Sequence, residues 1–160
     1  MTGTSTWTAL RNAAFRRLWI ANLISGSAIA AHGTAAFWVL SSLGKSDATL
    51  LLSLMATLSS LPFALLTLPA GAIADLADRK RMLCAVNLWQ AVVAIGLAVL
   101  GITRLLNPYV ILASALLFGV GFAFGSPASS AVIAEMVPAE DLPGANNLGG
   151  VQMNIAGIVG

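Results

Sequence analysis

The residues whose types could do acid–base or ionic chemistry are few, and most of them lie in two short polar segments. They are Asp75, Asp78 and Arg79–Arg81 in the first segment, and Glu135, Glu140 and Asp141 in the second. The single cysteine, Cys84, excludes an internal disulfide, and neither it nor the single histidine, His32, can form a metal site alone. These acids and the histidine do not form a recognisable catalytic set. We therefore expect no enzyme activity, no metal and no cofactor.

Long apolar stretches separate these polar residues and must position them. The chain is 58% hydrophobic and 9% charged, with a mean hydropathy of +0.90, whereas a soluble domain has about 25% charged residues. About 20 residues of helix cross a hydrocarbon core of about 30 Å, and lipid leaves no other way to pair the backbone of such a stretch. The sequence therefore predicts an all-α integral membrane fold. Its expected spans are about 18–40, 48–74, 82–103 and 109–134, followed by the start of a fifth at 145–160.

The distribution of basic residues predicts the orientation of these spans. If the polar segment 1–17 is cytoplasmic, the inner segments hold six of the eight lysines and arginines, which satisfies the positive-inside rule. We therefore expect a multi-pass protein of a bacterial inner or plasma membrane with a cytoplasmic N-terminus. Because the fifth stretch covers only part of a span, we also expect the sequence to be a truncated front part of a longer protein.

The polar segment between the second and third spans is the most specific feature of the sequence. Residues 71–81 read GAIADLADRKR, which resembles the loop G-x-x-x-D-x-x-G-R-[RK]-x of the major facilitator superfamily of transporters. The resemblance implies that Gly71, Asp75 and Arg79 belong to a cluster that pairs with the other half of the transporter and helps to hold its outward-facing state. Ordinary interfacial charge would explain Lys80 and Arg81 equally well.

Further stretches point to one branch of that superfamily. Asp78 replaces the commoner glycine, and an acid at this position resembles the drug and siderophore exporters. Residues 119–131 (GVGFAFGSPASSA) and 154–160 (NIAGIVG) resemble exporter motifs of the fourth and fifth spans, with Ala156 in place of a glycine. The spacing of Gly121 and Gly125 favours close helix packing over ligand contact, and Pro127 is expected to weaken or kink its helix.

One mildly polar stripe lies within the first expected span. Asn22, Ser25 and His32 fall within about 80° on a helical wheel, and the stripe could line a central cavity. A histidine titrates near neutrality, so that His32 could serve a proton or a substrate, although bonding to a neighbouring helix is the favoured alternative. The first four spans contain no acid and the fourth contains no arginine, which leaves a proton as a possible coupling ion without an assigned carrier.

The resemblance implies a secondary transporter that exports small organic compounds. Such transporters rock two halves around a site at the midplane of the membrane. We therefore expect the chain to need a second transporter half and to be inactive alone, with the lipid bilayer and an unidentified small molecule as partners and no nucleic acid. Two alternatives remain, namely a small multi-pass protein with an assembly or regulatory role and a membrane enzyme.

Overall fold

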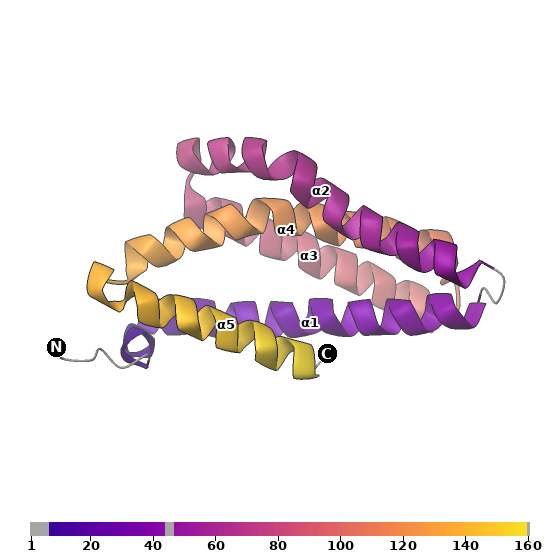
Figure 1. Ribbon diagram of the computed structural model, residues 1–160, viewed down its shortest axis with the longest axis horizontal. Coiled ribbons are helices and arrows are strands. Elements are labelled where there is room, and N and C mark those ends of the chain that lie inside the picture. Colours follow the sequence, from indigo (N-terminus) through magenta and orange to yellow (C-terminus); the bar gives the residue numbers. More distant parts are fainter. Residues whose placement is uncertain (1–6, 44–46, 160) are drawn as a thin grey trace. The chain divides into compact units, whose positions relative to one another are not determined.

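The computed structural model describes residues 7–43 and 47–159, except for the side chains of residues 43 and 74–76. Helices make up nearly all of this described part, and no strand occurs in it (Figure 1). In chain order they are η1 (Thr8–Arg11), α1 (Ala13–Leu43), α2 (Ala48–Leu76), α3 (Arg79–Ile102), α4 (Pro108–Met136), η2 (Ala139–Asp141) and α5 (Leu142–Val159). The two η elements are single 3-10 turns. The predicted all-α fold is therefore confirmed.

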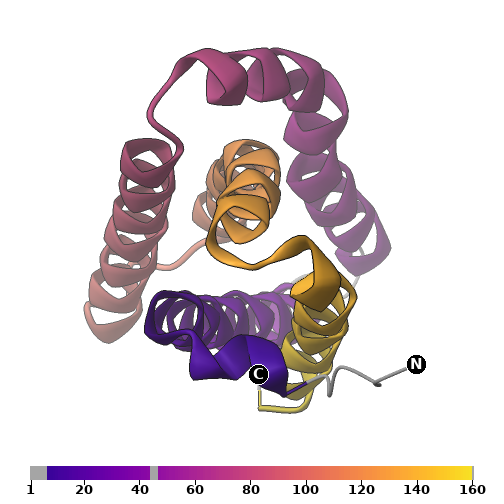
Figure 2. The same ribbon diagram turned by 90° about the vertical axis from the view of Figure 1, so that its left-hand side faces the viewer.

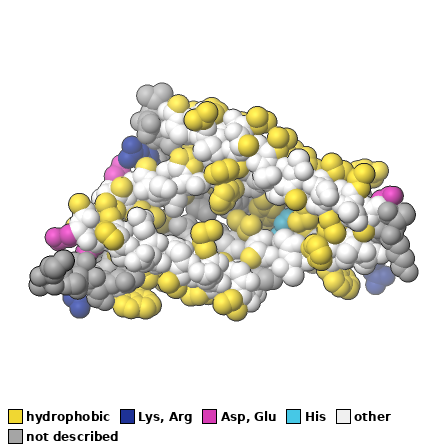
Figure 3. Space-filling view, viewed as in Figure 1, with side chains coloured by type: hydrophobic (Ala, Val, Ile, Leu, Met, Phe, Trp, Pro, Cys, Tyr) yellow, Lys and Arg dark blue, Asp and Glu magenta, His cyan; other side chains and the backbone are white. Residues whose placement is uncertain are grey.

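Four of the helices are long and apolar enough to cross a membrane. The candidate spans in α1, α2, α3 and α4 contain 30, 26, 24 and 29 residues, and α5 adds a fifth helix. On the face seen in Figure 3, charged side chains lie near helix ends and hydrophobic side chains cover the lengths between them. Most helix ends lie beyond the predicted apolar stretches because the backbone stays helical through flanking polar residues, although α2 begins at the predicted residue 48 and α3 ends one residue before the predicted 103.

Two prolines lie inside α2, at positions 62 and 69, without ending it. Each proline lacks an N–H and leaves the carbonyl four residues earlier without its helical donor. Figures 1 and 2 show that α2 changes direction along its length, as expected for a helix with internal prolines. Hydroxyl side chains bond back to the backbone around these positions, including Ser59 to the carbonyl of Met55 at 3.0 Å and Thr67 to the carbonyl of Phe63.

The C-terminus of α3 is closed by a residue in the left-handed conformation. Arg104 has a φ of 58°, its N–H donates to the carbonyl of Gly101 at 3.2 Å, and the N–H of Leu105 donates to the carbonyl of Leu100 at 2.9 Å. This pattern of two bonds is a Schellman motif, in which glycine is the usual residue at the position of Arg104. The motif reverses the chain into the short turn before α4.

The chain divides into two compact units, which we describe separately. The first unit runs to His32 and resumes at Ser129. Its core consists of Ala9, Phe15, Val137, Ala145 and Leu148. The indole N–H of Trp19 donates to the carbonyl of Leu148 at 2.9 Å, so that α1 is tied to α5 by a hydrogen bond as well as by apolar packing.

The second unit comprises residues 33–128. One buried cluster in it joins the end of α1 to the start of α4 through Ala36, Leu40 and Ile111, with residues of α2 packed around it. Farther along, α2 and α4 meet again where the rings of Phe63 and Phe122 lie 5.3 Å apart between centroids. The indole N–H of Trp89 donates to the carbonyl of Leu117 at 3.0 Å, which ties α3 to α4.

Candidate functional site

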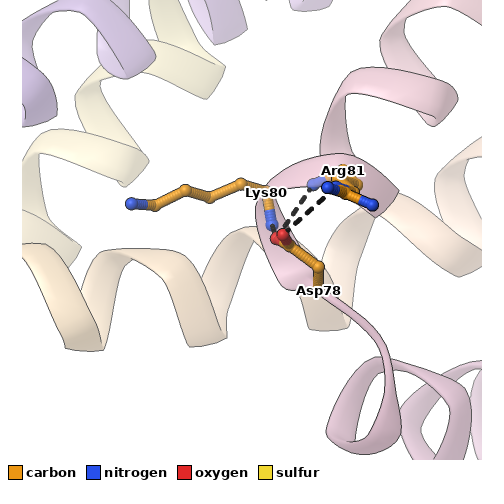
Figure 4. A network of polar contacts seen from close by, with 3 residues as sticks. All are labelled: Asp78, Lys80 and Arg81. Atoms are coloured by element: carbon orange, nitrogen blue, oxygen red, sulfur yellow. Dashed lines mark hydrogen bonds and ion pairs between the residues drawn. The ribbon is translucent and has the colours of Figure 1, made fainter.

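The short connection between α2 and α3 contains most of the predicted charged loop. Asp78 has an extended backbone (φ −66°, ψ 105°), and its carboxylate accepts the N–H groups of Lys80 at 3.0 Å and Arg81 at 3.3 Å (Figure 4). These are two of the donors that every helix leaves unpaired in its first turn. Asp78 is therefore the N-cap of α3, which gives a structural reason for an acid where the superfamily more commonly has glycine.

The same carboxylate forms an ion pair on the surface. The Nε atom of Arg81 lies 3.4 Å from Oδ2 of Asp78, and the two side chains are 90% and 55% exposed. An exposed pair of this kind contributes less than about 1 kcal/mol. Lys80 extends in another direction, away from Asp78 and Arg81 (Figure 4). The geometry therefore makes capping, rather than ion pairing, the main contribution of Asp78 within the described residues.

The other members of the predicted cluster lie on both sides of this cap. Gly71 is in the penultimate turn of α2, and no heavy atom of the described chain is within 4 Å of where a Cβ on it would be. Asp75 is in the last turn of α2, and its side chain is outside the described part. Arg79, the first residue of α3, is half-buried. The pairing of this cluster with another half of the transporter stays a prediction.

The glycines of α4 are in much closer contact with their surroundings. A Cβ on Gly121 would lie 3.1 Å from Cγ of Gln90, and a Cβ on Gly125 would lie 3.1 Å from Cγ1 of Val86, so both face α3. The closest approach is at Gly119, where a Cβ would lie 2.5 Å from the backbone oxygen of Ser59 in α2. Helix backbones can approach this closely only where a side chain is missing.

Gly119 was not predicted from the sequence as a contact position. The sequence did contain one indication of a second contact. Gly119 lies two residues before Gly121, and this spacing places the two glycines on different sides of a helix, where they can face two different neighbours. α4 continues through Pro127, which is half-buried. α4 therefore has a contact seam, which consists of Gly119, Gly121 and Gly125.

The polar stripe of α1 lies in the first unit. The side-chain amide of Asn22 donates to the hydroxyl of Ser129 in α4 at 3.4 Å. Asn22, Ser25 and His32 are all half-buried. This contact joins one member of the stripe to a serine that the sequence analysis did not name. The assignment of the stripe to a substrate cavity stays a prediction.

Asn12 is a third residue that was not predicted from the sequence. Its side-chain oxygen accepts the N–H groups of Ala14 at 2.9 Å and Phe15 at 3.4 Å, while its Nδ2 donates to the carbonyl of Met136 at 2.7 Å. Met136 is the last residue of α4, so its carbonyl has no partner inside that helix. Asn12 thus caps the beginning of α1 and the end of α4 at once.

Within the described residues, no group of three or more His, Cys, Asp or Glu side chains is placed to hold a metal ion. The chemistry that this part of the molecule offers is therefore hydrogen bonding, helix capping and surface charge. The charged residues of the loop lie at the ends of apolar helices, and the polar residues of the stripe lie within one.

The comparison with protein families agrees with these features. The chain matches the sequence model of a major facilitator family described as transmembrane secretion effector, over residues 4–160. No curated protein and no solved structure matches it. The match covers nearly the whole chain and includes both the charged loop and the seam of α4. The chain therefore belongs to the transmembrane secretion effector family and is a multi-pass membrane transporter of the major facilitator type.

Proposed function

We propose that this chain takes part in the export of small organic compounds by a secondary transporter. The observation that carries the proposal is the family match over residues 4–160. The charged loop at 71–81 and the four candidate spans support it. Transporters of this type bind substrate near the midplane and alternate its access by moving one half against the other. These 160 residues alone are expected to give no flux, since they contain four spans and a fifth helix rather than two halves.

We propose further that residues 71–81 face the cytoplasm and control which side of the transporter is open. The excess of lysine and arginine in segments that would be cytoplasmic supports this orientation. The open space beside Gly71 supports a role in contact with another helix, because a backbone without a side chain accepts a close neighbour. Asp75 and Arg79 would contribute the charges of this contact.

We also propose that Asn22, Ser25 and His32 line the path of the substrate. The bond from Asn22 to Ser129 supports this assignment, because it places polar groups of α1 and α4 together in two candidate spans of mainly apolar composition. His32 would carry the coupled proton. Packing against a neighbouring helix is the alternative role for His32, and replacement with glutamine separates the two, since glutamine can still form a hydrogen bond but does not titrate.

A chimera tests the proposed function. The 160 residues would be joined to the remaining helices of a family member with known export activity, and the parent transporter would be the control. We expect energy-dependent efflux of a fluorescent organic cation from cells that express the chimera, loss of efflux with Asp75→Asn, and no efflux with the 160 residues alone. A chimera that reaches the membrane but exports none of the parent's compounds would contradict the proposal.

A further inference from the structure

An apolar groove lies between α3 and α4 in the second unit. It has a volume of about 300 Å³, and the residues that line it include Met82, Ala85, Val86 and Trp89 of α3 with Gly121 and Phe124 of α4. The small side chain of Ala85 leaves this space open, whereas a Cβ on Gly121 would meet Gln90 and Trp89. In water such a groove would expose hydrophobic surface, but α3 and α4 are both candidate membrane spans, where an apolar surface is compatible with hydrocarbon.

The dimensions of the groove restrict what can fill it. Met82 and Trp89 are seven residues apart, which is roughly 10 Å along a helix. An α-helix with its side chains is about 10 Å in diameter, so a helix segment of that length is larger than the groove's volume of about 300 Å³. A single extended hydrocarbon chain is thin enough to lie along it.

A positive charge lies at the end of the groove where α3 begins. Arg81 precedes Ala85 by four residues and therefore lies on the same side of α3 as the groove. Its side chain is 90% exposed, and its ion pair with Asp78 is itself exposed. Residues 78–81 contribute three cations and one carboxylate. This end of the groove therefore attracts an anion at the level of the helix terminus, while the groove itself accepts only apolar groups.

We propose that the groove binds one anionic phospholipid, with its phosphate at Arg81 and an acyl chain along Met82, Ala85 and Trp89. The two ends of such a lipid match the two parts of the site, namely a cation at the helix terminus and an apolar channel directly below it. This lipid site is separate from the proposed path of the exported compound. It would bind whether or not the chain transports anything.

Quenching of Trp89 by brominated lipid tests the proposal directly, because Trp89 lines the groove. Trp7, Trp19 and Trp38 would be replaced by phenylalanine, and the chain would be reconstituted in phosphatidylcholine vesicles. Small amounts of acyl-brominated phosphatidylglycerol or acyl-brominated phosphatidylcholine would then be compared. We expect phosphatidylglycerol to bind roughly fivefold more tightly, which is the effect of about 1 kcal/mol for one cation near a membrane surface.

Matched variants on neighbouring faces of α3 give the controls. Arg81→Gln should remove the preference for phosphatidylglycerol, whereas Lys80→Gln, four residues before Cys84, should retain most of it. Ala85→Phe should fill the groove and abolish quenching by bound lipid, whereas Cys84→Phe, at a position that is also exposed but does not line the groove, should not. Because Trp19 also bonds to α5, circular dichroism must show that the single-tryptophan chain keeps its helices. If the helices are lost, binding of the same two lipids to the unaltered chain would be compared by native mass spectrometry.

Three results would overturn the proposal. Equal quenching by the two lipids would mean that ordinary bilayer lipid covers the groove. Equal effects of Arg81→Gln and Lys80→Gln would show general attraction to the basic segment rather than a site. Absence of quenching by either lipid would show that another helix or a second copy of the chain covers the groove.

Discussion

Glycines have opposite surroundings in two regions of this molecule. In the seam of α4, a Cβ on Gly119 would meet the backbone of α2 at 2.5 Å, and a Cβ on Gly121 or Gly125 would meet α3 at 3.1 Å. Near the end of α2, the space beside Gly71 is open in the described structure. The seam is occupied by contacts within the chain. The region of Gly71 instead has helix surface that no described residue covers.

The two regions also differ in how far apart in the sequence their contacts are. The seam joins residues of α4 to residues of α2 and α3 that are 30 or more positions earlier. The charged loop is organised locally, because Asp78 binds the N–H groups of residues two and three positions later. Tertiary packing therefore determines the first region, and the second can form as soon as α3 does.

The largest expected effect is at Gly119. Gly119→Ala would place a methyl group against the Ser59 carbonyl, where backbone rather than a flexible side chain must move. We expect the free energy of unfolding to fall by about 2 to 3 kcal/mol, measured by titration with a denaturing detergent and followed by circular dichroism. The matched control is Gly96→Ala in α3, which has no heavy atom of the described chain within 4 Å of the new methyl group. Equal destabilisation by both variants would show that the seam is not a tight contact.

Asn12→Ala should have the next largest effect. The variant loses the cap of α1, worth about 1 kcal/mol, and the bond to the carbonyl of Met136, worth up to about 1 kcal/mol. We expect a loss of about 1 to 2 kcal/mol in the same detergent titration. Asn12→Asp separates the two contributions, because aspartate can still cap α1 but cannot donate to Met136. If Asn12→Asp were as destabilising as Asn12→Ala, the cap would not contribute.

Substitutions at Asp78 test what stabilises the charged loop between α2 and α3. Asp78→Ala should cost about 1 kcal/mol, whereas Asp78→Asn should cost much less, since the amide oxygen can accept the same N–H groups. If the ion pair with Arg81 were the main contribution instead, Asp78→Asn would destabilise the chain as much as Asp78→Ala. High salt would then bring the free energies of unfolding of the parent chain and the variants together. Detergent titrations at low and high salt make this comparison.

The smallest expected effect on stability is at Gly71. Because no described residue outside its own helix turn lies within 4 Å of the new methyl group, Gly71→Ala should change the free energy of unfolding by less than about 0.5 kcal/mol. The same substitution in an exporting chimera should reduce efflux if another helix approaches Gly71 there, as proposed. Unchanged efflux would mean that the open space remains open in the working transporter.

The helices were predictable from the sequence because lipid permits no other backbone structure for long apolar stretches. The residues at which the helices begin and end were less predictable. The third span was predicted from residue 82, but α3 begins at Arg79, because the cap at Asp78 depends on hydrogen bonding and not on hydropathy. Gly119 and Asn12 were missed for a related reason. Their partners, Ser59 and Met136, are distant in sequence, and no spacing along the chain indicates which backbone atoms will meet.

The connection between α2 and α3 has a consequence for how the protein is made. Only Ala77 and Asp78 separate the two helices, and two residues span about 7 Å at most, so the beginning of α3 stays beside the end of α2. During synthesis, the charged loop therefore cannot move away from either helix end. Asp78 begins α3 as it leaves the ribosome. A residue that caps a helix in the finished protein thus also marks the point at which the growing chain turns back into the membrane.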